Sequence, residues 1–205
     1  MKGSAYTIGF AAVLGSACAL LLTAAASFTK PYKEANQQAE EARNILQALN
    51  VPRQDGTSWH GASSAEVVKA REDNVKEKKK GDLTTYVYEV NGETKATAIR
   101  FAGPGLWGPV KGFLALEPDM KTIRGMTIYE QEETPGLGGE IVAPWFRDQF
   151  VGKSVVDAAG VPGIIISMSG EPAANKVDGI SGATMTCDKV QAMLNEAIKS
   201  IVEEK

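Results

Sequence analysis

An uncharged stretch of about 23 residues near the amino terminus, Tyr6 to Phe28, most constrains what this 205-residue chain can fold into. Folded as a helix that rises 1.5 Å per residue, it is roughly 34 Å long, enough to cross the hydrocarbon core of a bilayer. Lys2 precedes the stretch, and Lys30 and Lys33 follow it. We therefore predict that residues 1–30 form a single-pass transmembrane anchor.

Two other interpretations of this stretch remain open. Ala24-Ala25-Ala26 could be a signal-peptidase site, and the helix would then be removed. The apolar run is long for a signal peptide, so we favour a retained anchor. A lipoprotein is less favoured, because Gly15 stands where the motif before Cys18 needs a leucine-like residue. Lysines on both sides give no clear charge bias, so the residues alone do not orient the helix.

Residues 31–82 are mostly polar, and we predict that they form a helical stalk and connector. Pro31 suits the first turn of a helix that would run to Leu49. A loop follows that contains His60, the only histidine, for which we expect a surface position. A second, charged helix is expected over residues 65–80.

Strand signals begin at Leu83. Four runs are expected to be strands: Tyr86–Val90, Ala96–Phe101, Val110–Leu116 and Thr122–Tyr129. Asn91-Gly92, between the first two, is typical of a two-residue hairpin turn. Consecutive strands joined by short turns favour an antiparallel sheet. We therefore predict an α+β fold class for residues 83–205, with helices packed on the sheet.

The segments after the sheet give weaker signals. Residues 132–140 hold three glycines and a proline, which indicates a defined loop where the backbone can approach a flat ligand. A helix is expected over Ile141–Phe150, and a short buried strand over Ile164–Met168. The segment between them, from Val155 to Ala159, is expected to be helix or turn.

The chain ends in an amphipathic pattern from Cys187 to Glu204, whose apolar residues recur at the spacing of a helix with one buried face. Directly before it stands Asp178-Gly-Ile-Ser-Gly-Ala-Thr-Met-Thr186, with three hydroxyls in nine residues. Thr186 occupies the position expected for the N-cap. A helix start offers free N–H groups and a positive dipole end, so this place favours an anion such as phosphate.

This string resembles, at every defined position, the flavinylation motif D-G-x-S-G-A-T-x-T of a family of FMN-binding-domain subunits. The family includes NqrC, of the sodium-translocating NADH:quinone oxidoreductase, and RnfG, of the Rnf ion-translocating electron-transport complex. The resemblance implies that FMN is bound covalently, as a phosphoester, to Thr186. It also implies that a separate flavin transferase installs the cofactor from FAD.

Two further strings extend the resemblance. The loop E-T-P-G-L-G at residues 133–138 is similar to both NqrC and RnfG, whereas G-L-W at 105–107 followed by G-F-L-A-L looks more like NqrC. The length of the chain suits RnfG, so the choice between the two complexes stays open. The residues that the resemblance places around the phosphate are Ser181, Gly182, Ala183 and Thr184. Those that it places beside the flavin ring are Leu106, Trp107, Thr134, Gly136, Leu137 and Gly138.

Two of these assignments have alternatives. Trp107 could stack on the ring or be an ordinary core tryptophan. Asp178 could orient the hydroxyls, bind the transferase, or form a simple Asx turn.

Composition excludes several other functions. The net charge of −3 does not indicate nucleic-acid binding. The sequence shows no metal-ligand cluster, and a disulfide between Cys18 and Cys187 is not expected, because Cys18 lies in the apolar stretch. No Ser/His/Asp or Cys/His set suggests a catalytic centre.

The resemblance implies an electron-transfer subunit of an ion-translocating oxidoreductase, without substrate turnover of its own. It would sit in the bacterial inner membrane among other subunits, with its FMN domain on the extracytoplasmic, periplasmic side. One alternative is a stand-alone extracytoplasmic FMN-binding carrier or reductase. Another is a membrane-tethered binding module without flavin.

Overall fold

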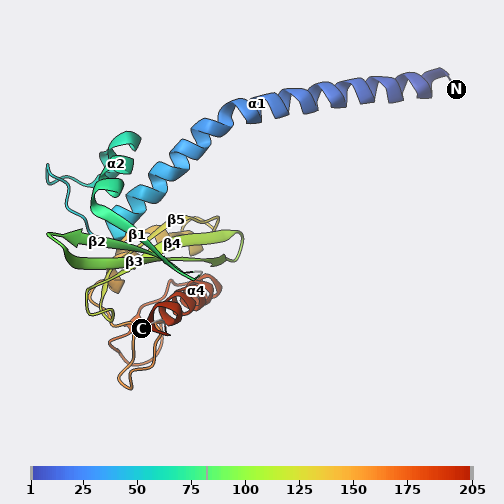
Figure 1. Cartoon of the computed structure of the whole chain (residues 1–205). Coiled ribbons are helices and arrows are strands. Elements are labelled where there is room, and N and C mark those ends of the chain that lie inside the picture. The colour runs from blue at the N-terminus through green and yellow to red at the C-terminus, as the bar shows by residue number, and fades with distance from the viewer. Residues whose placement is uncertain (1, 82, 204–205) are drawn as a thin grey trace. The chain divides into compact units, whose positions relative to one another are not determined.

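The computed structural model describes residues 2–81 and 83–203 (Figure 1). The chain divides into two compact units, Met1–Ala39 and Glu40–Lys205. The ends predicted for the connector, at residue 82, and for the last helix and domain, at residues 204 and 205, lie outside the described residues. The division into anchor, connector and domain stays a prediction.

The first helix, α1, runs from Lys2 to Ala48 and contains Pro31 in its interior. Our expectation that Pro31 starts a second helix was wrong. Proline removes only one backbone donor, and the long helix on either side retains its hydrogen bonds. Nearby, the Thr29 hydroxyl donates to the carbonyl of Ala25 at 2.9 Å, which gives a helical carbonyl an additional partner.

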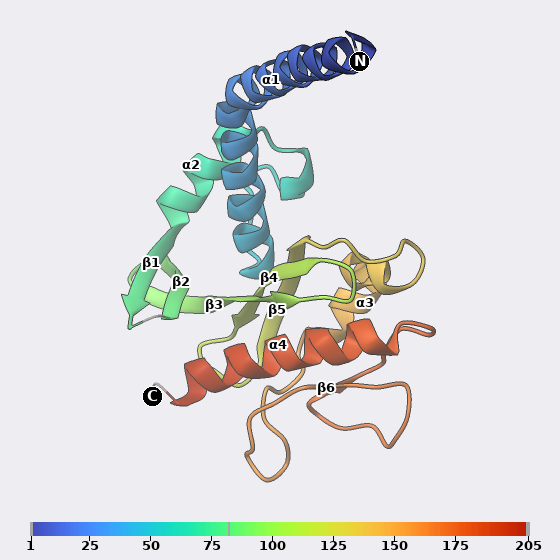
Figure 2. The same cartoon turned by 90° about the vertical axis from the view of Figure 1, so that its right-hand side faces the viewer.

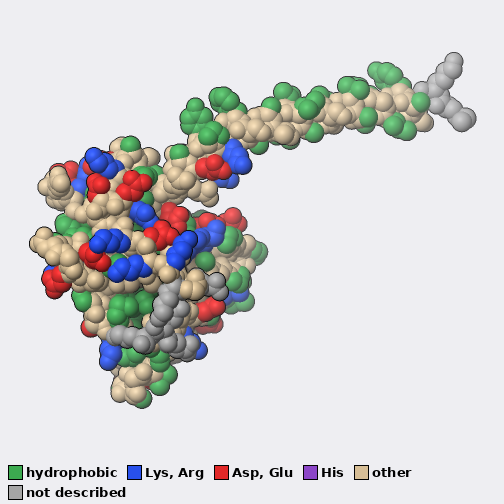
Figure 3. Space-filling view, viewed as in Figure 1, with side chains coloured by type: hydrophobic (Ala, Val, Ile, Leu, Met, Phe, Trp, Pro, Cys, Tyr) green, Lys and Arg blue, Asp and Glu red, His purple; other side chains and the backbone are tan. Residues whose placement is uncertain are grey.

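The amino-terminal part of α1 carries apolar side chains along the face seen in Figure 3, and no charged residue occurs between Gly3 and Thr29. Its large apolar residues are between 52% and 76% exposed, for example Tyr6, Leu14 and Leu20. By length and composition this helix could cross a membrane. A helix that is apolar all round has no polar face to turn to water.

After α1 come two short helices, Trp59–Gly61 and α2 (Ser64–Asn74), and then five antiparallel strands. The strands are β1 (Val75–Lys80), β2 (Leu83–Val90), β3 (Glu93–Pro104), β4 (Pro109–Leu116) and β5 (Ile123–Glu130), and they pair in chain order. The hairpin turn is confirmed, because Asn91 and Gly92 both have positive φ, at 54° and 80°. The predicted α+β class is thereby confirmed.

Strand β1 corrects the expectation of a helix over residues 65–80, since α2 ends at Asn74. The charged run that we assigned to a solvated helix end is instead the edge of the sheet. Lys76 and Lys78 both pair with Glu89 of β2, at 2.6 and 3.4 Å. Lysines on an edge strand oppose pairing with a further strand, so this composition suits an edge.

The two faces of the sheet bury different cores, because successive side chains of a strand point to opposite sides. On β4, Leu114 and Leu116 pack into one core, whereas Phe113 and Ala115 pack into the other. The first core is covered by the carboxy-terminal helix α4 (Thr184–Glu203), which crosses the sheet in Figure 2. We call this the cofactor face and the other the anchor face.

On the cofactor face, the chain from β5 to α4 is held mostly in loops and short elements. The helix expected over residues 141–150 is three short pieces: Gly138–Val142, α3 (Pro144–Arg147) and Asp148–Phe150. The expected strand at 164–168 is reduced to β6 (Ile165–Ile166), which pairs in parallel with β7 (Lys176–Val177). Residues 155–159, for which helix or turn was expected, include a turn at 158–159. Phe146 and Phe150 fill the core beneath.

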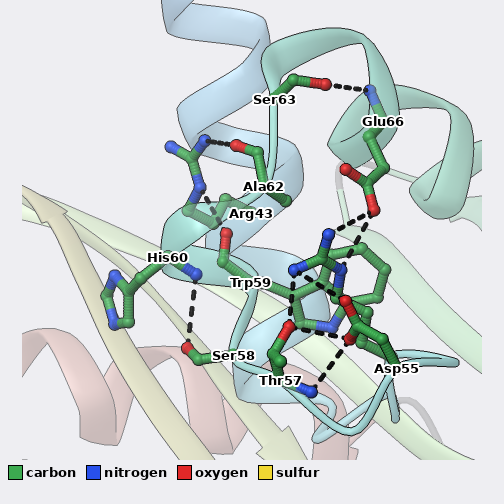
Figure 4. A network of polar contacts seen from close by, with 10 residues as sticks. Arg43, Asp55, Thr57, Ser58, Trp59, His60, Ala62, Ser63 and Glu66 are labelled. Carbon is green, nitrogen blue, oxygen red and sulfur yellow. Dashed lines mark hydrogen bonds and ion pairs between the residues drawn. The ribbon is translucent and has the colours of Figure 1, made fainter.

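On the anchor face, the last turns of α1 and the loop that follows are joined by a polar network (Figure 4). Arg43 donates to the carbonyls of Trp59 and Ala62, both at 3.0 Å. Arg53 pairs with Glu66 of α2 at 2.8 Å. His60 is exposed, as expected. The network joins the end of α1 to the loop and α2, while Arg124 and Thr127 of β5 donate to the carbonyls of Leu49 and Asn44 and hold this part of the chain on the sheet.

Candidate functional site

Helix α4 starts at Thr184, three residues before the expected start at Cys187. Thr186 is therefore the third residue of the helix and not its N-cap, which corrects the sequence-based prediction. Its side chain does not cap the backbone; its hydroxyl donates to Oε2 of Glu133 at 2.6 Å. Thr186 and Glu133 are 2% and 4% exposed, so this hydrogen bond is buried.

Glu133 connects three segments. Its Oε1 accepts the backbone N–H groups of Leu106, at 2.7 Å, and Trp107, at 3.1 Å. Its own N–H donates to the side chain of Gln131 at 2.6 Å. No salt bridge to Glu133 occurs within residues 2–81 and 83–203. A buried carboxylate is costly unless donors compensate it, and here three donors do so without a cation.

A cavity of about 400 Å³ opens beside this pair. It is lined by Leu106, Trp107, Glu133, Thr134, Leu137, Gly138, Gly182, Ala183, Thr184, Met185 and Thr186. Four of the lining side chains are large and apolar yet exposed: Leu106 at 39%, Trp107 at 70%, Leu137 at 43% and Met185 at 60%. Apolar walls with few polar groups are typical of a small-molecule site of this size.

The first turn of α4 adds donors to the cavity. The backbone N–H groups of Thr184, Met185 and Thr186 have no acceptor among the described residues, as expected for the first turn of a helix. These three residues all line the cavity. The helix dipole places its positive end here, so an anionic group of a ligand would be favoured.

Gly138 is required by the close packing at the bottom of the cavity. A Cβ atom at this position would lie 2.5 Å from the Thr186 hydroxyl oxygen and 2.8 Å from Oε2 of Glu133. The short approach of the 133–138 loop to α4 therefore depends on the missing side chain.

The structure brings together nine of the twelve predicted site residues. Those that line the cavity are Leu106, Trp107, Thr134, Leu137, Gly138, Gly182, Ala183, Thr184 and Thr186. Ser181, Gly136 and Asp178 do not line it, and all three are exposed. The Asp178 carboxylate has no hydrogen-bond partner in the described part of the chain, so no Asx turn forms, and its proposed role stays a prediction.

Trp107 is too exposed to be a core tryptophan, and its position in the cavity wall agrees with a ligand contact. The sequence analysis missed two lining residues, Met185 and Glu133. The signal for Glu133 was present, because it is the first residue of the E-T-P-G-L-G loop. Its partner, 53 positions away, could not be read from the sequence.

The thiol of Cys187 lies beside this site but does not join it. Its sulfur accepts the N–H of Ile180 at 3.3 Å, and burial raises the pKa of the thiol. Cys187 and Cys18 are both free. No cluster of potential metal ligands occurs in the part of the chain that the structure describes.

A second cavity, of about 590 Å³, lies at the β5 edge of the sheet, and its lining includes the end of α1 and residues between 147 and 151. Two of its arginines are already paired, Arg53 with Glu66 and Arg124 with Glu117, at 2.8 and 3.0 Å. We assign the functional site to the smaller cavity, because that one contains the motif hydroxyl, the buried carboxylate and the unpaired N–H groups.

The fold and the cavity define an α+β domain with an apolar-walled cavity that meets the first turn of α4. Residues 105–199 match the family described as the FMN-binding domain. This match agrees with the family recognised from the motifs. All lining residues of the cavity lie within the matched segment.

Curated relatives agree with this family. The chain is 44% identical over 108 residues to NqrC of the Na(+)-translocating NADH-quinone reductase from Vibrio anguillarum; the match covers 52% of this chain and 42% of the relative. It is 29% identical to the protein of the same name from Haemophilus ducreyi, across 88% of this chain and 84% of that one. The match to the Vibrio anguillarum protein thus spans less than half of that relative's length.

Solved structures support the fold. The crystal structure of NqrC of the Na(+)-translocating NADH-quinone reductase from Parabacteroides distasonis superposes with a TM-score of 0.71 at 27% identity, covering 85% of this chain and 95% of that one. NqrC from Shewanella oneidensis gives a TM-score of 0.62 at 24% identity, which supports the fold alone. Both agree with the predicted architecture of an antiparallel sheet with packed helices.

Proposed function

We propose that this protein is a membrane-anchored covalent flavoprotein subunit that relays electrons within a sodium-translocating NADH:quinone oxidoreductase. The observation that carries the proposal is the Thr186 hydroxyl, which is buried at the start of α4 and lines a cavity with apolar walls. The relatives named above favour the NqrC type over the Rnf type that the motifs left open.

The residues present fit FMN attached as a phosphoester. Thr186 would hold the phosphate, and the free N–H groups of the first α4 turn would offset its charge. Leu106, Trp107, Leu137 and Met185 would cover the faces of the ring, which explains why apolar side chains line the cavity yet remain exposed. FMN supplies one-electron chemistry, and the chain supplies binding and orientation.

We place the protein in the bacterial inner membrane, with α1 as its single span and the FMN domain on the periplasmic side. The apolar surface of α1 supports a span, and the side is inferred from the family. The partners would be the other subunits of the complex and a flavin transferase. No substrate turnover of its own is expected, because an electron relay needs only a cofactor held near its neighbours.

The test is Thr186→Ala, expressed in full length with a flavin transferase. The wild-type band on a denaturing gel should show flavin fluorescence, because a phosphoester survives unfolding, and the variant band should show none. Thr186→Ser is the matched control, since it keeps a hydroxyl, and it should retain fluorescence. Fluorescence in Thr186→Ala, or its absence in the wild type, would reject the proposed attachment.

Purification from native membranes tests the assignment to a complex. Co-purification with several hydrophobic subunits is expected. Isolation as a lone flavoprotein, with residues 1–28 removed, would support the stand-alone extracytoplasmic carrier or reductase instead.

A further inference from the structure

Glu133 and Thr186 form a hydrogen-bonded pair between two segments that are distant in the sequence. The carboxylate lies 2.6 Å from the hydroxyl oxygen that would become esterified. Both groups are buried, and the carboxylate has no salt bridge within the described residues. A carboxylate that accepts a proton from a nucleophilic hydroxyl is the arrangement of a general base and its nucleophile.

We propose that Glu133 is the proton acceptor for the attachment of FMN to Thr186. The inference rests on the proposed function, because it concerns how the same phosphoester forms. The co-reactant is a flavin dinucleotide, whose pyrophosphate supplies the riboflavin-bound phosphoryl group. The Thr186 oxygen attacks that phosphorus and forms a new P–O bond. The bond to the nucleotide phosphate breaks, its electron pair leaves with AMP, and the hydroxyl proton moves to Glu133.

The surroundings of Glu133 fix its orientation for this step. The N–H groups of Leu106 and Trp107 hold Oε1, which directs Oε2 at Thr186. Gly138 leaves the space that lets the two side chains meet. Thr186 and Glu133 both line the cavity, so a group bound there would lie beside the two side chains.

The proton transfer also resolves a conflict of charge. A phosphodiester and a carboxylate would repel each other if both were anionic at this distance. When Glu133 takes the hydroxyl proton, it becomes neutral as the phosphate arrives. A neutral carboxyl group can then donate a hydrogen bond to the ester.

Other acidic side chains near the motif are poorly placed for the same role. Glu132 precedes Glu133 but does not line the cavity. Asp178 belongs to the flavinylation string, yet it is exposed and outside the cavity. Glu133 is the acidic residue among those lining the cavity.

The experiment compares Glu133→Gln with Glu132→Gln in the full-length chain. The apoprotein is made without transferase, then mixed with purified flavin transferase and FAD, and flavin incorporation is followed by intact mass. Glutamine keeps an oxygen for the Leu106 and Trp107 amides but removes the basic oxygen. We expect Glu133→Gln to slow incorporation on the order of a hundredfold, as for loss of a general base. Glu132→Gln should match the wild type.

If Glu133 had a purely structural role, Glu133→Gln would lower the melting temperature and the hydrogen-exchange protection of the Leu106 and Trp107 amides. Under the proposal, both quantities should stay near wild type in this variant. Wild-type rates of incorporation in this variant would overturn the inference and leave the proposed function intact. Absence of flavin in the wild type would instead remove the proposed function.

If Glu133→Gln does not fold, Glu133→Asp gives the answer. Aspartate keeps the charge but is one methylene shorter, so it cannot reach both the two amides and Thr186. Slowed incorporation would support the inference, and a wild-type rate would overturn it.

Discussion

The two faces of the sheet treat charge in opposite ways. On the anchor face, Arg53 is paired with Glu66, and Arg124 with Glu117. On the cofactor face, Glu133 is more deeply buried than the side chains of these two pairs, but it has no cationic partner among the described residues. Paired charges fix one segment against another, whereas an unpaired buried carboxylate remains available for chemistry. The difference separates the structural face from the functional one.

Two glycines, one on each face of the sheet, differ in the same way. A Cβ atom on Gly125, on the anchor face, would lie 2.5 Å from the carbonyl oxygen of Ala48, so its absence lets the end of α1 pack on β5. A Cβ atom on Gly138 would lie equally close to the Thr186 hydroxyl. One glycine makes room for backbone packing and the other for a reactive side chain.

Among the variants that test the difference between the two faces, Gly138→Ala is expected to have the largest effect. The added methyl group should displace Thr186 or Glu133, so covalent flavin should fall to near zero, while overpacking costs about 1–3 kcal/mol of stability. Flavin fluorescence on a denaturing gel and a thermal melt measure the two effects. Gly125→Ala is the matched control, with a similar stability cost and wild-type flavin. Equal flavin loss in both variants would show that the faces are not separable.

A smaller effect, on stability alone, is expected from Leu46→Ala. Leu46 is fully buried on the anchor face, and truncation of a buried leucine costs about 2–5 kcal/mol through lost burial and a residual cavity. Urea unfolding measures this cost. Flavin content per folded molecule should be unchanged. Val68→Ala, at a partly buried site of the same core, should cost less.

The smallest effect is expected from the acid titration of Asp55 on the anchor face. The N–H and the hydroxyl of Thr57, at 2.9 and 2.7 Å, hold the pKa of this carboxyl below its ordinary value. A lowered folded-state pKa stabilises the fold above the unfolded-state pKa of about 3.9, and this contribution is lost as pH falls through the folded value.

Thr57→Val should raise the pKa of Asp55 toward its ordinary value, as measured by NMR titration of the carboxyl carbon. Flavin content should not change, because Asp55 and the cofactor site lie on different faces. A pKa that stays low in the variant would show that the hydroxyl contributes nothing to the shift.

Much of the fold could be predicted from the chain because it follows from local pattern. Three features depend only on neighbours within one element: the apolar run up to Phe28, the Asn91-Gly92 turn and the apolar stripe of α4. The errors occurred where tertiary contacts outweighed local pattern. The charged run at residues 75–80 became a strand because β2 offered Glu89 and backbone partners. Pro31 stayed within a helix, although its residue type favours a helix start.

The sequence by itself singled out Thr186 as the candidate attachment residue, because Thr186 stands in a contiguous motif whose spacing can be read directly. It also determined the class of the fold and the apolar span. Only the tertiary structure decided what that hydroxyl touches. Glu133 lies 53 residues earlier, and it meets Thr186 because the sheet, the Gly138 loop and α4 converge. A linear pattern records spacing along one element, whereas a buried hydrogen bond between distant segments exists only after the chain has folded.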